Sequence, residues 1–235
     1  MKLICFPHAG GFASYYNFIS GYEFSSIDEV LVYEYAGRST RYREPPARTF
    51  DECIAQAYDY VSNAVEEDEE YALFGHSMGA FTAYETACRM TDCGRPPAIV
   101  ILSGQKPVRD VEKGYYTDSP DVAFPMIEKL GGLPDYIREH RELMKNFFAL
   151  TLSDFRLLSS YTPTTSHPLG KLPLGILLCG TDDFELKGHD LEKWGYEFDD
   201  FLGVRYFEGD HFYLKNYRME VCRIIDELIT EKVRT

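Results

Sequence analysis

Short apolar runs recur along the chain and alternate with stretches of helical periodicity. The runs are rich in β-branched and aromatic side chains, which favours β-strands. The predicted strands are Lys2–Phe6, Val30–Tyr35, Tyr71–Phe74, Ile99–Ser103, Gly175–Cys179 and Val204–Phe207. Their apolar positions are nearly continuous rather than alternating, as expected where helices cover both faces of a parallel sheet.

Helices are predicted between these strands. Apolar side chains recur at helical spacing in Phe50–Val65 and again from Tyr217 to Leu228, and Ala80–Ala87 is also helix-like. Strands that alternate with helices predict the α/β class with a doubly wound, mainly parallel sheet. Because the 235 residues show no internal repeat or low-complexity linker, we expect a single domain over residues 1–235.

The region from about 108 to 173 interrupts this alternation, because no strand is predicted within it. Its helix-like pieces are Val122–Leu130, Leu133–Glu139 and Glu142–Leu158. Apolar side chains occupy more than one face of the last piece, so a helix with one buried stripe does not explain them. Either neighbouring helices bury this helix, or it forms a lid over an apolar substrate channel. The two interpretations are compatible, and Phe147, Phe148 and Phe155 are the candidate channel residues.

A candidate nucleophile lies in Gly75-His76-Ser77-Met78-Gly79, between a predicted strand and a helix-like stretch. A serine in a strained turn between strand and helix projects its hydroxyl beyond the edge of the sheet, and small flanking residues let the two elements approach closely. By itself the pattern also fits a glycine-rich turn with a passive serine. The interpretation as a nucleophile therefore depends on finding a base, an acid and oxyanion donors elsewhere.

His211 is the candidate base, because it follows the last predicted strand and precedes the final helix. His76 is expected to point away from the serine, and His140, His167 and His189 are interpreted as surface residues. The acid is expected between serine and histidine in chain order, and Asp182 and Asp183 both follow the strand Gly175–Cys179. An aspartate there also suits an ordinary turn. The order of serine, aspartate and histidine, each at a strand end, is nevertheless typical of a Ser-His-Asp hydrolase.

An oxyanion hole requires two backbone N–H groups. The residue after the nucleophile, Met78, supplies one in such turns. The other is expected from the loop after an early strand, where Phe6–Gly11 ends in two glycines that allow backbone to approach a ligand. Without the other catalytic residues, this glycine pair would be interpreted only as a turn.

Charge and cysteine content restrict the partners and the compartment. The net charge of −14 argues against nucleic acid and anionic membranes as partners. The apolar run before Pro7 is too short for a signal peptide or membrane span, and six scattered cysteines lack the spacing of a zinc site. We therefore expect reduced thiols, no metal and a cytoplasmic location. Against the acidic background, arginines gather at Arg38, Arg41, Arg43 and Arg48, either in a solvated loop or in a basic patch for an acidic partner.

Several motifs in order give the chain a resemblance to a known family. They are Phe6–Gly11, Gly37-Arg38 with Arg41 and Glu44-Pro45-Pro46, Gly75–Ala80, Leu130–Gly132, Ser153–Phe155, Gly180–Asp183, Trp194 and Gly209–Phe212. With these motifs the chain resembles the type II thioesterases, stand-alone α/β-hydrolases that accompany polyketide and nonribosomal peptide synthetases. The resemblance implies an α/β-hydrolase fold with a helical lid insertion.

The resemblance also implies roles for individual residues. Ser77, Asp183 and His211 would form the triad, with Asp182 as the fallback acid, and the amides of Met78 and Ala9 would bind the oxyanion. The substrate would be an acyl group on the phosphopantetheine arm of an acyl or peptidyl carrier protein, and no metal or organic cofactor would be needed.

Other functions remain open. Arg38, Arg41 and Arg43 would help an acidic carrier protein to dock, or they would anchor their loop internally through Glu44. The same triad also suits a general carboxylesterase or lipase, a fatty acyl-carrier-protein thioesterase or a chain-releasing macrocyclase. A non-catalytic binding relative that keeps the fold is a further alternative.

Overall fold

A computed structural model of the protein describes residues 1–112, 116–117, 119–131, 139–167 and 170–233. Within these ranges one sheet has the order β2-β1-β3-β4-β5-β6, and every neighbouring pair is parallel. Its strands are β1 Lys2–Phe6, β2 Glu29–Val32, β3 Tyr71–His76, β4 Ile99–Ser103, β5 Leu172–Gly180 and β6 Phe198–Phe207. The predicted doubly wound sheet is therefore confirmed, and the strand order reverses between β1 and β3, where such sheets bind ligands.

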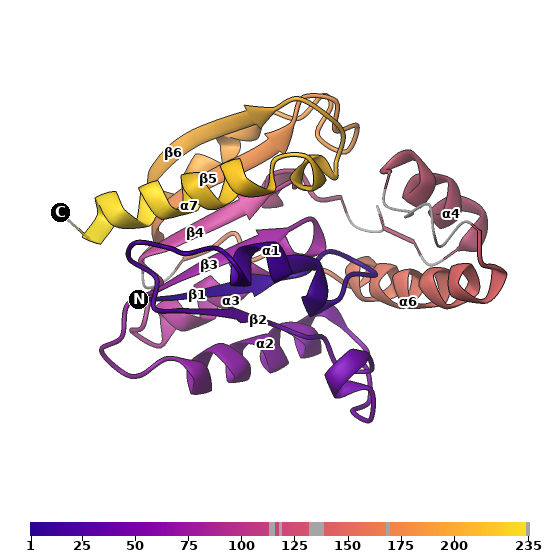
Figure 1. The fold of residues 1–235 in the computed structure, drawn as a ribbon, viewed down its shortest axis with the longest axis horizontal. Helices are drawn as coiled ribbons and strands as arrows, with labels where there is room; N and C mark the ends of the chain where they lie inside the picture. Colours follow the sequence, from indigo (N-terminus) through magenta and orange to yellow (C-terminus); the bar gives the residue numbers. More distant parts are fainter. Residues whose placement is uncertain (113–115, 118, 132–138, 168–169, 234–235) are drawn as a thin grey trace.

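Helices cover both faces of this sheet (Figure 1). α2 Phe50–Ala64 and α3 Met78–Asp92 pack on one face, and α1 Asn17–Ser20 and α7 Arg218–Val233 pack on the other. Short 3₁₀ turns complete the chain at Ala13–Tyr16, Ser39–Arg41, Val108–Asp110, Leu191–Tyr196 and Tyr213–Lys215. The burial of both faces explains why most strands have continuous apolar runs.

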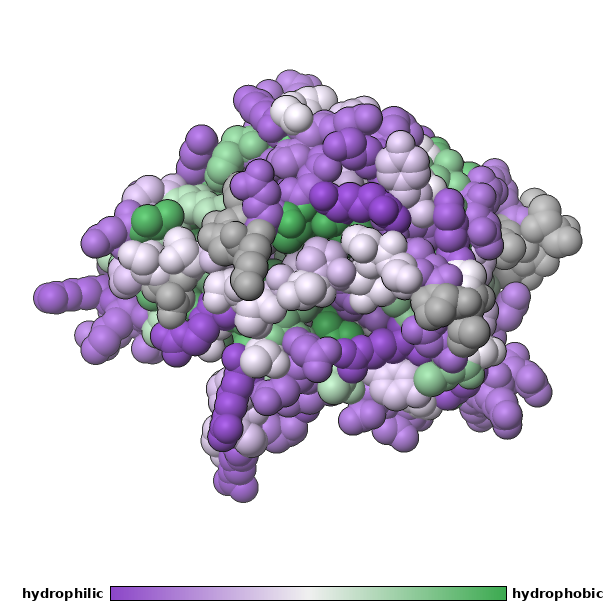
Figure 2. Space-filling model, turned by 180° about the vertical axis from the view of Figure 1, so that it is seen from behind, coloured by the Kyte–Doolittle hydropathy of each residue, from purple (hydrophilic) through white to green (hydrophobic). Residues whose placement is uncertain are grey.

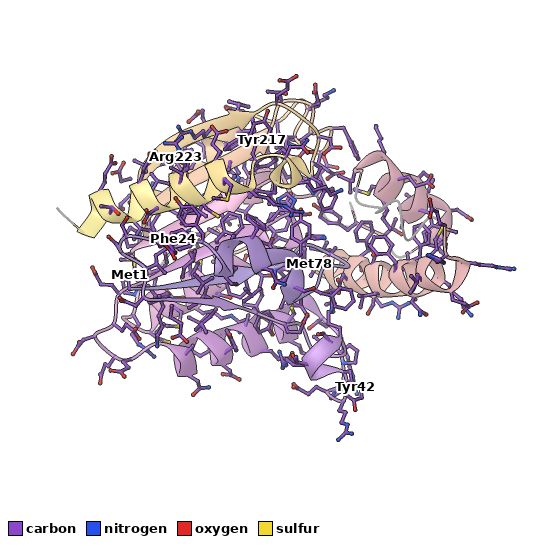
Figure 3. All side chains as sticks on the ribbon, viewed as in Figure 1. Met1, Phe24, Tyr42, Met78, Tyr217 and Arg223 are labelled. Atoms are coloured by element: carbon purple, nitrogen blue, oxygen red, sulfur yellow. The ribbon has the colours of Figure 1, made fainter. Side chains whose placement is uncertain are left out.

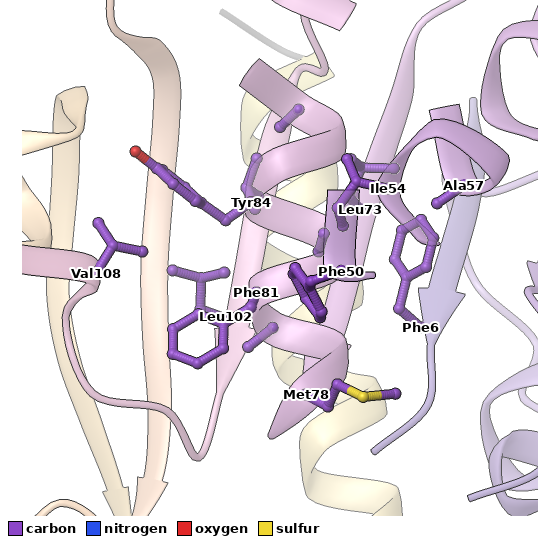
Figure 4. Close-up of a cluster of buried hydrophobic side chains, with 14 of the residues drawn as sticks. Phe6, Phe50, Ile54, Ala57, Leu73, Met78, Phe81, Tyr84, Leu102 and Val108 are labelled. Atoms are coloured by element: carbon purple, nitrogen blue, oxygen red, sulfur yellow. The ribbon is translucent and has the colours of Figure 1, made fainter. Parts of the chain in front are cut away.

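The core around α3 shows how these layers fit together. Side chains of α3, including Phe81 and Tyr84, pack between the sheet residues Leu73 and Leu102 and the first turn of α2 at Phe50 (Figure 4). In the first turn of α2, the Thr49 hydroxyl accepts the amide of Glu52 at 3.2 Å. The Glu52 carboxylate in turn accepts the amide of Arg48, the residue before the cap, at 2.8 Å, so that side chains at both ends of this turn fix the start of the helix.

The edge strands differ most from the sequence prediction. β6 begins at Phe198 rather than at Val204, and its middle residues are exposed or only partly buried. An edge strand needs no continuous apolar run, so aspartates at Asp199 and Asp200 concealed its first half. At the other edge, β2 ends at Val32 instead of Tyr35, although the Tyr33 amide still donates to Cys5 O at 2.9 Å.

Two lid helices follow β4 and precede β5 along the chain. They extend beyond the carboxyl ends of the strands (Figure 1). They are α4 Pro120–Lys129 and α6 Arg141–Ser159, close to two of the predicted pieces. The third piece, 133–139, falls largely on residues 132–138, outside the described ranges. α6 buries Thr151, Asp154 and Phe155 against the rest of the protein, so this helix is partly core as well as lid.

The surface is mostly hydrophilic on the face opposite that of Figure 1, with hydrophobic atoms showing in recesses between polar side chains (Figure 2). Among the described helices, none has the length and apolar composition needed to cross a membrane. All six cysteines are free thiols, as predicted, and Cys93 is the exposed one.

Candidate active site

Ser77 lies at the sharp turn between β3 and α3. Its backbone adopts φ 57° and ψ −121°, a region that non-glycine residues rarely occupy. A Cβ at Gly75 would lie 1.9 Å from Gly79 O, and a Cβ at Gly79 would lie 2.0 Å from Phe6 O. Both glycines are thus required sterically, the first for contact between β3 and α3 and the second for contact between α3 and the end of β1.

His211 and Asp183 form a buried pair beside this turn. His211 Nδ1 lies 2.7 Å from Asp183 Oδ2, and both residues are 2% exposed. The other carboxylate oxygen, Oδ1, accepts the amide of Glu185 at 3.1 Å. The side chain of Asp182 is exposed, and its amide donates to Gly209 O at 2.8 Å. Of the two candidate acids, Asp183 is therefore the one that contacts the histidine, while Asp182 ties the two loops together through its backbone.

The candidate base and the candidate nucleophile meet at one cavity. His211 and Ser77 line the same cavity, and no described residue hydrogen-bonds His211 Nε2. Ala9 lines this cavity too, at the end of the loop after β1. Met78 is the first residue of α3, so its N–H has no acceptor within the helix. Met78 lies where the sheet meets the lid (Figure 3).

The cavity at Ser77 has two limbs under the lid. The first contains about 340 Å³ of empty space open to solvent and is lined by lid residues that include Ile127, Phe147 and Phe155. The second contains about 290 Å³ of empty space, part of it open to solvent. It shares Ser77, Ala9, Leu130, Phe155 and His211 with the first and is also lined by Gln105, Tyr116, Met126, Leu158 and Glu185.

The lid residues expected to line a channel divide into two groups. Phe147 and Phe155 line the cavity, as predicted. Phe148 is absent from the lining of this cavity and packs against Phe124 of α4, with ring centroids 4.2 Å apart. Phe148 therefore joins the two lid helices. The helical stripe alone did not distinguish a side chain facing the cavity from one facing the next helix.

Further histidines surround the pair. His8, in the loop after β1, is 8% exposed and lines the cavity, a role that the sequence analysis did not assign. Burial, with the nearby His211 charge, lowers the pKa of His8 to about 3, and burial likewise holds the pKa of His76 well below its ordinary value. The His76 ring is 5.0 Å from that of His211, and its Nδ1 lies 2.9 Å from Ser103 Oγ. His76 therefore packs behind the candidate base as a neutral side chain.

The remaining histidines are only partly at the surface. His140 is exposed, as predicted, and His189 is partly exposed and contacts Asp110 at 3.0 Å. The surface prediction was wrong for His167, whose side chain is 10% exposed and contacts the fully buried Glu197 at 2.6 Å. Glu197 also pairs with Arg109 at 2.6 Å. A loop sequence gives no sign of such a distant buried carboxylate.

The arginine cluster is mainly structural. Arg38 is 6% exposed, and its guanidinium binds both oxygens of Asp154 in α6 at 3.0 and 2.5 Å. The docking hypothesis is therefore wrong for Arg38, because a buried side chain cannot meet a partner. Arg41 binds Glu44 at 3.0 and 2.5 Å and donates to Glu34 O at 2.8 Å, which supports the internal anchoring alternative.

Arg43 alone of the three docking candidates is exposed. It contacts Tyr42, which lies at the tip of a loop projecting from the body (Figure 3). A docking role therefore stays a prediction for Arg43.

Asp154 joins the lid to the loop that contains Ala9, the candidate oxyanion donor. Its Oδ2 accepts the amide of Gly10 at 2.7 Å, and Arg38 also donates to Gly11 O at 3.0 Å. Gly10 has φ +73°, and a Cβ there would lie 2.3 Å from the Thr151 hydroxyl of α6. The sequence analysis noted Ser153–Phe155 only as a lid motif, and its contact with the loop after β1 was not predictable from local pattern.

The described ranges contain no group of three or more His, Cys, Asp or Glu side chains that could hold a metal ion.

Comparison with known proteins identifies the family. Residues 1–229 match the family model described as "Thioesterase domain". The chain is 30% identical over 224 residues to the probable cadicidin biosynthesis thioesterase of Streptomyces griseus, which covers 92% of this chain and 59% of that protein.

Solved structures show the same relationship. ClbQ, from the colibactin NRPS/PKS pathway, superimposes with a TM-score of 0.88 at 25% identity over 98% of this chain and 97% of that one. BorB, a type II thioesterase from the borrelidin biosynthetic cluster, gives a TM-score of 0.83 at 28% identity over 97% of this chain and 92% of that one.

Proposed function

The chain belongs to the thioesterase domain family, and on this premise we propose that it hydrolyses acyl thioesters carried on the phosphopantetheine arm of carrier proteins. The pathway class would be that of NRPS/PKS relatives such as ClbQ, with removal of stalled or misprimed acyl groups as the role. The observation that carries the proposal is the buried His211–Asp183 pair at 2.7 Å, with Ser77 and His211 lining one cavity under an apolar lid.

In the proposed reaction, Ser77 Oγ attacks the thioester carbonyl and His211 Nε2 takes its proton. Asp183 holds the Nδ1–H of the imidazole, which fixes the tautomer and stabilises the imidazolium. The amides of Met78 and Ala9 donate to the tetrahedral oxyanion, each contributing about 3–4 kcal/mol. The C–S bond then breaks, and the proton on His211 passes to the departing thiolate.

The second half of the reaction releases the acid. Water attacks the acyl-serine while His211 accepts a proton from it, and the proton returns to Ser77 Oγ when the C–O bond breaks. Nucleophile, base and oxyanion donors all come from the chain, so the proposed reaction needs no metal or organic cofactor. The carrier protein supplies the phosphopantetheine arm.

The fold of the turn explains why a serine is reactive in this position. The strained backbone of Ser77 and the sterically required Gly75 and Gly79 expose the hydroxyl at the edge of the sheet that also carries the His211 loop. The fully buried carboxylate of Asp183 acts in a medium of low dielectric, where its effect on the imidazolium is larger than in water. These features support hydrolysis over the alternative of a non-catalytic binding relative.

Mass spectrometry of an acylated carrier protein tests the proposal. The protein should convert acyl-carrier protein to free acid and free phosphopantetheinyl thiol. Ser77→Ala should lower kcat more than about 10³-fold, because the nucleophile is lost. The matched control is Ser159→Ala, at an exposed position of α6, and it should leave the rate unchanged. Unchanged acyl loading with the unaltered protein, or full activity of Ser77→Ala, contradicts the proposal.

The carboxylesterase alternative requires a separate comparison. An acyl-pantetheine thioester and the oxygen ester of the same acyl chain should be hydrolysed with a higher kcat/KM for the thioester. Equal or higher turnover of the ester favours a general esterase with the same catalytic residues.

A further inference from the structure

The second limb of the cavity ends in polar side chains. Gln105, Tyr116 and Glu185 line it, and they are 2%, 6% and 5% exposed. The rest of its wall is apolar and comes from Met126, Leu130, Phe155 and Leu158. Apolar walls suffice for a plain alkyl chain, so the polar end of this limb indicates a different kind of ligand group.

Gln105 is held in one orientation. Its Oε1 accepts the amide of Lys106 at 2.9 Å and the Tyr116 hydroxyl at 3.4 Å. A backbone N–H can only donate, so the oxygen of the side-chain amide must be the atom that faces it. Trp194 Nε1 donates to Gln105 O at 3.1 Å and fixes the backbone of the same residue.

The amide nitrogen of Gln105 is thereby left with two unused donors. No acceptor contacts it in the part of the chain that the structure describes, although the residue lines the cavity that contains Ser77. A ligand atom that entered this limb would therefore meet N–H donors. An oxygen acceptor satisfies them, whereas a methylene group leaves them unpaired.

The charges at this end of the limb balance each other. Glu185 Oε2 lies 3.7 Å from Lys106 Nζ, and both side chains are buried. Lys106 also lies over the Tyr116 ring, 5.6 Å from its centroid. Since the carboxylate and the ammonium already pair with each other, neither requires a charged group from a ligand, and a neutral group suits this end of the limb.

We propose that Gln105 is a specificity determinant that donates a hydrogen bond to a neutral oxygen, such as a keto, hydroxyl or amide carbonyl group, on the acyl chain of the substrate. The protein would then prefer oxygenated acyl groups to alkyl groups of equal length. This inference rests on the proposed function, since it concerns the acyl group that Ser77 receives.

Octanoyl-pantetheine and a series of octanoyl thioesters with one oxo group at successive positions provide the test. At one position at least, kcat/KM should exceed that of octanoyl by about 10–100-fold, because the unsubstituted chain leaves the amide donors unpaired. Gln105→Leu should abolish this preference, so that the octanoyl and oxo-octanoyl thioesters have similar kcat/KM values. Gln56→Leu is the matched control, since Gln56 lines a separate cavity away from Ser77, and it should retain the preference.

A second variant keeps the test decisive if Gln105→Leu does not fold. Gln105→Glu retains an acceptor for the Lys106 amide but presents an oxygen in place of the donor, so it should disfavour the oxo series. Absence of any oxo preference in the unaltered protein, or its persistence in Gln105→Glu, overturns the inference.

Binding measurements separate this inference from the proposed function. Calorimetry with non-hydrolysable acyl-pantetheine amides gives the same oxo-against-alkyl comparison without turnover. If no thioester is hydrolysed, the proposed function fails. If the amides bind without an oxo preference, the inference about Gln105 fails, whatever the catalytic result.

Discussion

Replacing Asp154 by asparagine should destabilise the protein strongly, because it removes the partner of a buried cation. The two side chains of the Arg38–Asp154 pair are 5% and 1% exposed. Burial lowers the pKa of Arg38, but the adjacent carboxylate of Asp154 raises it by more, so the pKa lies above its ordinary value. Arginine keeps its proton in proteins, so in Asp154→Asn a charged guanidinium stays buried without a carboxylate beside it and retains only neutral acceptors such as the carbonyl of Gly11.

The magnitude follows from the burial of the pair. An exposed ion pair contributes at most about 1 kcal/mol, whereas loss of one partner from a buried pair costs about 3–5 kcal/mol. The exposures place Arg38 and Asp154 in the second class. For a chain of this length, each kcal/mol shifts Tm by about 2–4 °C, so Asp154→Asn should lower Tm by about 6–20 °C.

Activity gives a second measure of the same contact. Asp154 holds the Gly10 amide, and Gly10 directly follows Ala9, the proposed oxyanion donor. Loosening this loop should lower kcat of the folded variant about 10–100-fold and change KM little, because the oxyanion develops only in the transition state. Calorimetric unfolding and steady-state kinetics with an acyl-pantetheine thioester measure the two effects.

A double substitution separates charge from packing. Arg38→Met combined with Asp154→Leu removes both charges and should recover most of the lost stability, since apolar replacement of a buried pair is often neutral. Its kcat should stay low, because the Gly10 amide loses its acceptor. A Tm for Asp154→Asn within about 2 °C of the unaltered protein would refute this reasoning, since a surface pair behaves in that way.

Three further predictions concern pH, backbone packing and docking. The pKa of His8 falls from 6.5 to about 3 on folding, so the unfolded chain binds more protons between these values and stability is lost as pH falls through them. The loss should be about 2 kcal/mol from pH 7 to pH 5, and His8→Gln should flatten it in thermal unfolding against pH. Gly79→Ala should cost at least about 3 kcal/mol in denaturant unfolding, because its Cβ would meet backbone, while Gly195→Ala, with nothing nearer than 3.5 Å, should be near neutral. Arg43→Glu should raise KM for the carrier protein about 2–5-fold and leave KM for a short thioester unchanged, whereas Arg41→Glu, which breaks internal bonds, should affect both alike.

The sequence predicted the elements whose signals are local. Lys2–Phe6 and Ile99–Ser103 form strands with the predicted ends, because both faces are buried and every position except the terminal Lys2 and Ser103 is apolar. The turn at Ser77 was predictable for the same reason, since its strand, serine and flanking glycines lie within a few residues of one another. Strand β6 was only half predicted, because its exposed edge lets polar residues into the pattern.

Features that depend on distant partners were not predictable. Arg38 belongs to a run of arginines that looks solvated, but its counter-ion lies 116 residues away in the lid. Phe148 shares its helical spacing with residues that line the cavity, but it packs against Phe124 because α4 lies beside it in the fold. In the sequence His167 has the pattern of an ordinary loop histidine, and only the fold places Glu197 beside it.

The distinction between local and distant signals also separates the reacting groups from the groups that hold them. Ser77, Asp183 and His211 must each follow a strand, because a parallel sheet brings its carboxyl ends to one edge, and that requirement leaves a trace in the order of motifs. The side chains that hold the catalytic loops, such as Asp154, need only reach the loop from whichever element passes nearby. Their effect therefore depends on packing, and substitutions there should change the rate although the substituted residue takes no direct part in the reaction.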